Sequence, residues 1–94
     1  MFVATCVITL ELYGVESLKD KRRILKPILA HIRQHYNLSA AEVDYHDIWQ
    51  TAVIGLAAVG TDSGHLHGLL EKCVDWIEQY RPDTPIHTYH IEFR

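Results

Sequence analysis

The sequence predicts an α+β domain in which four strands form one antiparallel sheet and two helices cover one face of that sheet. Its 94 residues are enough for a single hydrophobic core. Two long segments repeat apolar residues every three or four positions, and four other segments alternate apolar with other residues. The order of these segments is strand, helix, strand, strand, helix, strand, which is the order of a split βαβ fold.

The first strand is predicted over residues 2–12 because every second residue there is apolar. Ser17 then starts a helix over residues 18–36, and Asp20 completes a variant of the capping box. Asn37 suits a left-handed helix stop. Pro27 lies inside this helix and predicts a bend, since proline removes one backbone hydrogen bond.

Residues 38–44 and 49–60 are predicted as two strands of a hairpin, joined by a polar turn at residues 45–47. Trp49 and Trp76 are assigned to the core or its rim. The second helix follows the capping segment 61–64 and ends before Pro82. A last strand is predicted over residues 86–93, where the alternation returns.

Placed in this order, the elements predict one ferredoxin-like domain over residues 1–94 with the topology βαββαβ. Its four-stranded antiparallel sheet has the spatial order 4-1-3-2, and both helices lie on one face. Strands one and three are central in this arrangement. They are also the two strands with apolar residues on both faces, among them Val7 and Val53.

Composition excludes several classes of protein. No apolar run approaches the roughly 20 residues that cross a bilayer, so no membrane partner is expected. The first residues lack the basic segment of a signal peptide, which favours a cytoplasmic location. Cys6 and Cys73 are therefore predicted to be reduced and to pack as small buried hydrophobic side chains.

Several strings of residues resemble the YlxP-like family, a domain of unknown function numbered 503. They are Ser17-Leu18-Lys19-Asp20-Lys21-Arg22-Arg23, Ala41-Glu42-Val43, Asp47-Ile48-Trp49-Gln50, and Ile54-Gly55-Leu56-Ala57 with the following Asp62. The resemblance covers nearly the whole chain. It implies a small ferredoxin-like bacterial protein whose gene often lies among genes for translation initiation and ribosome maturation, and it implies no established activity.

The first helix concentrates the positive charge of the chain. Its six basic residues and one acidic residue give a net charge of +5, whereas the rest of the chain carries −8 and the whole −3. Several cations lie in the N-terminal turns, where they oppose the helix dipole, and no glutamate within the helix pairs with them. We therefore predict an anion- or RNA-binding site formed by Ser17, Lys19, Lys21, Arg22, Arg23, Lys26 and Arg33.

This site predicts a non-enzymatic binding protein that docks on structured RNA or on a ribonucleoprotein, with the ribosomal context taken from the family resemblance alone. The phosphate backbone would supply salt-dependent affinity. The open sheet face lacks the aromatic side chains of an RRM-type platform, so stacking on the sheet is not expected.

Three alternatives stay open. The cations of the first helix form a stripe along it, and such a stripe is also typical of a plain solvated helix face. The small, β-branched open sheet face favours a homodimer, and with it a dimeric scaffold or a small-ligand sensor. Finally, Asp44, His46 and Asp47 form the only compact acid/base cluster. It could serve a metal-assisted phosphodiesterase, although an Asx-type turn with a partly solvated histidine is the favoured explanation.

The remaining signals point to no catalytic residue, metal ligand or cofactor. The sequence contains no P-loop, GxGxxG, CxxC or nucleophile-elbow motif. Seven histidines are many for this length, but none belongs to a three- or four-ligand pattern. His31 and His35, one turn apart, are expected to add positive charge to the helix at mildly acidic pH.

Overall fold

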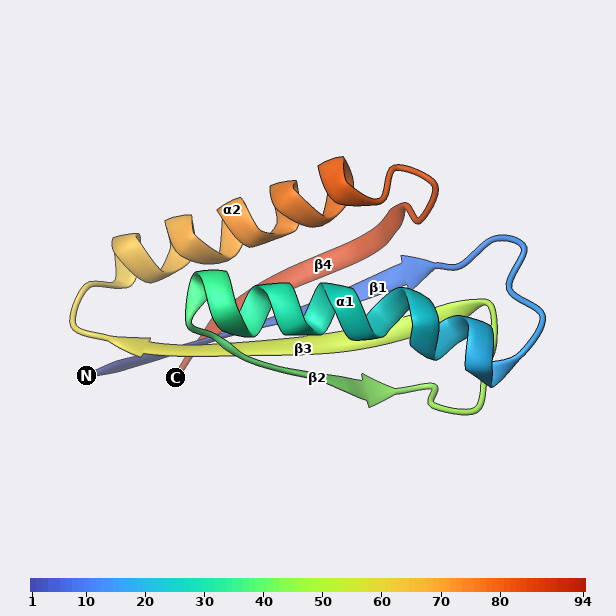
Figure 1. Cartoon of the computed structure of the whole chain (residues 1–94). Coiled ribbons are helices and arrows are strands. Elements are labelled where there is room, and N and C mark those ends of the chain that lie inside the picture. Colours follow the sequence, from blue (N-terminus) through green and yellow to red (C-terminus); the bar gives the residue numbers. More distant parts are fainter.

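The computed structural model describes all residues, 1–94, and contains six elements in the predicted order (Figure 1). They are β1 (Phe2–Glu11), α1 (Leu18–Tyr36), β2 (Ser39–Asp44), β3 (Thr51–Gly60), α2 (Ser63–Tyr80) and β4 (Ile86–Phe93). The four strands form one antiparallel sheet in the order β2-β3-β1-β4, and both helices lie on the same face of it. The predicted ferredoxin-like fold is confirmed.

The strand register explains the two faces of the sheet. Cys6 of β1 pairs with Leu56 of β3 and with Ile91 of β4, and these side chains face the helices. Val7, one position later, pairs with Gly55 and His90 on the open face. Because side chains alternate along a strand, one face of β1 enters the core and the other stays uncovered by helices.

Local signals fix the helix ends. The Ser17 hydroxyl accepts a hydrogen bond from the Asp20 amide (3.1 Å), and the Asp62 carboxylate accepts one from the His65 amide (3.1 Å). Asn37 ends α1 with a φ of 53°, the left-handed conformation predicted for it. The helix runs unbroken through Pro27, which is exposed, as is Arg23, the residue whose carbonyl loses its usual donor.

The hairpin between β2 and β3 differs from the prediction. β3 begins at Thr51, so Trp49 and Gln50 belong to a loop over residues 45–50. The Gln50 side chain donates to the Val15 carbonyl (3.2 Å), and the Gln50 carbonyl accepts from the Leu12 amide (2.8 Å). These bonds tie the end of the loop to the β1–α1 connection. Trp49 is therefore 43% exposed, and its assignment to the core or rim is wrong.

Candidate nucleic-acid interface

The exposed surface of α1 carries most of the cations that the sequence predicts for the anion site. Lys19, Arg22, Arg23 and Lys26 are all exposed. Lys19, Arg22 and Lys26 have no carboxylate oxygen within 4.0 Å, because every ion pair in the chain involves other side chains. Three of the predicted site residues are thus free to meet an anion from solvent.

Arg23 and Arg33 each contact another group of the fold, but both residues stay exposed. Arg23 lies 3.8 Å from the Asp20 carboxylate in an exposed pair one turn apart, a contact that contributes little in water. Arg33 donates from Nε and Nη2 to the Ala40 carbonyl of β2, at 3.0 and 2.6 Å. Both guanidinium groups keep their charge on the surface, so they add to its positive potential.

Lys21 does not belong to this surface, and its inclusion in the predicted site is corrected. Its side chain is buried, and Nζ lies 2.8 Å from Glu42 Oε2. Nζ also donates to the carbonyls of Tyr45 (2.6 Å) and Ile48 (2.7 Å), which uses all three of its protons. An anion in solvent cannot reach it.

The sequence did contain a signal for this burial. Lys21 precedes three buried residues of α1, Leu25, Ile28 and Ile32, by four, seven and eleven positions. This spacing places Lys21 on the core side of the helix and away from the stripe formed by the other cations. At Lys21 the helical position decides the role: the side chain is basic, but it lies on the core face of α1.

Ser17 has a structural role at this site. Its hydroxyl caps α1 by accepting from the Asp20 amide, as a helix start requires. That amide is therefore already satisfied, and a bound anion would depend chiefly on side-chain cations. The backbone amides of the first turn therefore contribute less to anion binding than expected, and the exposed side chains contribute most of it.

A shallow hollow of about 240 Å³ lies along the side of α1 that faces β2. Its lining brings together three cations and two apolar residues of α1 with one carboxylate of β2: Arg22, Leu25, Lys26, Leu29, Arg33 and Glu42. Since a helix rises about 1.5 Å per residue, the three cations extend over about 16 Å. The Glu42 carboxylate pairs with the buried Lys21, which offsets its negative charge.

Burial raises the pKa values of both cysteine thiols. Burial, together with the charge of Glu71, raises the pKa of Cys6 to about 11. Burial, with a contribution from Cys6, raises the pKa of Cys73 to about 12. Both thiols are free and packed in the core, as predicted. They are not nucleophiles at neutral pH.

His31 stacks on Trp76 of α2, with ring centres 3.8 Å apart and planes inclined by 3°. Loss of hydration lowers the pKa of His31, and repulsion by His35 lowers it further. His31 therefore stays neutral to lower pH than a free histidine. This corrects the expectation that it adds charge to the helix under mildly acidic conditions.

The predicted acid/base cluster does not assemble. The Asp44 carboxylate accepts from the Tyr45 amide (2.8 Å), and the His46 ring contacts the Glu42 carbonyl (3.1 Å). Nowhere in the chain do three or more His, Cys, Asp or Glu side chains come close enough to hold a metal ion.

Neither helix combines the length and the apolar character that a bilayer crossing requires.

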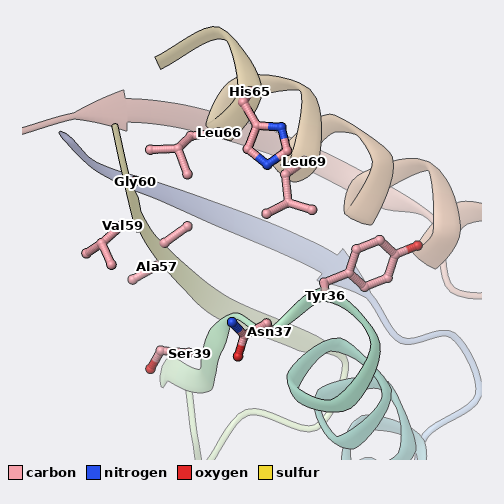
Figure 2. A pocket seen from close by; sticks show the side chains of 10 residues that line it. Tyr36, Asn37, Ser39, Ala57, Val59, Gly60, His65, Leu66 and Leu69 are labelled. Atoms are coloured by element: carbon pink, nitrogen blue, oxygen red, sulfur yellow. The ribbon is translucent and has the colours of Figure 1, made fainter. Parts of the chain in front are cut away.

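The largest hollow, about 650 Å³, lies at the other end of the molecule (Figure 2). Figure 2 shows it between Tyr36 and Asn37 at the end of α1 and Leu66 and Leu69 of α2, over the last residues of β3. Lysine and arginine are absent from its lining. It is therefore a separate feature from the cationic surface of α1.

Comparison with known proteins agrees with the family resemblance. Residues 3–91 match the model of a family described as protein of unknown function (DUF503). An uncharacterized protein YlxP of Bacillus subtilis (strain 168) is 33% identical over 69 residues, which cover 73% of this chain and 75% of that protein.

Among solved structures, a designed protein agrees on the fold, and on the fold alone. The de novo designed protein Foldit4 is similar over 100% of this chain and 97% of its own, with a TM-score of 0.53 and 12% identity. A putative antibiotic biosynthesis monooxygenase from Deinococcus radiodurans has a TM-score of 0.45 at 17% identity, over 100% of this chain and 90% of its own, too distant to bear on function. With the match spanning nearly its whole length, this chain belongs to the DUF503 family.

Proposed function

We propose that this chain is a non-enzymatic binding protein that docks on RNA, alone or within a ribonucleoprotein, through the exposed cations of α1. One observation carries the proposal: Lys19, Arg22 and Lys26 are exposed on one helix and unpaired by any carboxylate of the fold. The exposed cations of α1 outnumber its single carboxylate by four, while the whole chain has a net charge of −3.

The physical chemistry favours a polyanion over a small anion. The cations are spread along several turns of helix instead of converging on one point. A phosphate backbone is extended in the same way and releases counterions when it meets such a row of charges. These contacts position the RNA but carry no sequence information. The family resemblance favours an RNA of ribosome maturation or translation as the partner, and we propose that the contact forms in the cytoplasm.

The proposal is tested with the double variant Arg22→Glu/Lys26→Glu. A matched control is Lys72→Glu/Arg94→Glu, which changes the net charge equally at exposed positions outside α1. Sedimentation with ribosome fractions is measured at about 50 and 200 mM salt. We expect the α1 variant to lose co-sedimentation at low salt and the control to keep it. Equal behaviour of the two variants, with both folded by circular dichroism, would overturn the proposal.

Self-association through the open sheet face is a second candidate. Val7 and Val59 are exposed there, and a hollow of about 430 Å³ lies beside Val7, bordered by Val43 and Gly55. Apolar side chains gathered on one face favour burial against a second copy. A dimer that Val7→Lys converts to a monomer, measured by analytical ultracentrifugation, would support this candidate; a wild-type monomer at high concentration would dismiss it.

A further inference from the structure

The loop between β2 and β3 displays three large apolar side chains to solvent. Tyr45, Ile48 and Trp49 are 51%, 48% and 43% exposed, although the loop has only six residues. A single exposed apolar side chain is ordinary, whereas a short loop that presents two aromatic rings and an isoleucine suggests a contact surface. The open sheet face has no such rings, so this loop is a separate aromatic surface.

Lys21 fixes this loop against α1. Its ammonium group donates to the carbonyls of Tyr45 and Ile48, on either side of the turn. Arg22, the next residue of α1, is exposed and unpaired. The aromatic loop and the first cations of the helix are therefore held side by side at one end of the sheet (Figure 1).

The backbone at Tyr45 is strained. Its φ is +54°, a left-handed conformation that favours glycine or asparagine over an aromatic residue. The Tyr45 amide donates to the Asp44 carboxylate, and the Tyr45 carbonyl accepts from Ile48 and from Lys21. The surroundings thus hold an unfavourable conformation in place. Such over-determined strain is typical of residues whose side chain has a function.

We propose that the RNA segment bound at this end is unpaired, with its bases stacked on Trp49 and Tyr45 and its phosphates against Lys19 and Arg22. This inference rests on the proposed function and names the kind of RNA. Aromatic rings beside cations are the usual combination for single-stranded nucleic acid, because a free base has an accessible π-face. Bases within a duplex are stacked on each other and cannot reach the rings. Duplex RNA would use the cations alone.

Two negative side chains, Asp47 and Asp44, lie near this contact and oppose it. Asp47 is exposed and makes no ion pair, so it repels phosphates that approach the loop. Asp44 matters less because its carboxylate is directed to the Tyr45 amide. Replacement of Asp47 by asparagine keeps the shape of the turn and removes the repulsion.

The experiment compares a labelled single-stranded oligonucleotide of about ten nucleotides with a duplex of the same length, by fluorescence anisotropy on the full chain. Trp49→Ala is expected to weaken single-strand binding about tenfold or more and to leave duplex binding unchanged. Tyr45→Asn removes the second ring while favouring the backbone conformation, so it weakens single-strand binding without unfolding the loop. Asp47→Asn is expected to strengthen single-strand binding at low salt.

Trp49 itself reports the contact. In a Trp76→Phe background, single-stranded RNA is expected to quench the remaining tryptophan fluorescence, and duplex RNA is not. If Trp49→Ala and Tyr45→Asn bind the single strand as the wild type does, while Arg22→Glu/Lys26→Glu does not, the stacking inference fails and the proposed function stands. If the charge variant binds both RNAs normally, the proposed function fails. If Trp49→Ala weakens binding to a protein partner and leaves RNA binding unchanged, the inference is also overturned.

Discussion

The ammonium group of Lys21 lies 2.8 Å from the Glu42 carboxylate, in a position where the lysine side chain is only 2% exposed. This pair joins the first turn of α1 to the edge strand β2. The same ammonium group holds two carbonyls of the following loop. One buried charge thereby connects the cationic helix to the aromatic loop.

We expect Lys21→Met to lower the free energy of unfolding by about 2–4 kcal/mol, because it leaves Glu42 without its counter-charge and two loop carbonyls without their donor. The measurement is chemical denaturation followed by circular dichroism. In a double-mutant cycle, Glu42→Gln should cost less in the Lys21→Met background than in the wild type. Strictly additive effects would show that the two groups do not interact.

The salt dependence of RNA binding should report the number of α1 cations in contact. Lys19→Gln is expected to reduce the slope of log K against log salt by about one, and the same change at Lys26 should act equally. Lys72→Gln on α2 serves as the control and should leave the slope unchanged. A slope insensitive to both α1 substitutions would place the phosphates elsewhere.

Cys6 and Cys73 should resist thiol reagents in the folded protein. Burial holds their pKa values at about 11 and about 12, so neither forms thiolate near pH 8. We expect no reaction with Ellman's reagent over minutes in native buffer and reaction of two thiols in denaturant. Rapid labelling of the native protein would contradict the core packing described for both residues.

Stability should fall as the pH is lowered through the range in which His31 titrates. The pKa of His31 is lowered in the folded state from its usual 6.5, so the unfolded chain binds the proton more readily and protonation favours unfolding. The stabilising contribution is present above pH 6.5 and is lost below it. His31→Phe keeps a ring against Trp76 and removes the titration. Denaturation at pH 7.5 and 5.5 should show a smaller difference for this variant than for the wild type.

The sequence alone was sufficient for the fold and for the bounds of most elements. Period-two alternation and 3.6-residue periodicity are local consequences of strand and helix geometry, and they are visible without any partner. The helix caps are equally local. Ser17 and Asp62 accept from amides three residues further along, and Asn37 itself adopts the left-handed conformation that ends α1. The excess of positive charge on α1 is likewise a property of the chain before it folds.

The tertiary structure decided which of those charges can meet a ligand. Lys21 and Lys19 are two residues apart, yet one is buried against Glu42 and the other is exposed. That outcome depends on an acceptor 21 positions further along, which only the packing of α1 on β2 brings within reach. Trp49 likewise lies outside the core, because β3 begins only at Thr51 and Gln50 is bonded to Leu12 and Val15. Local periodicity places Lys21 on the core side of α1, but the partners of its ammonium group and the start of β3 are set by contacts between distant segments.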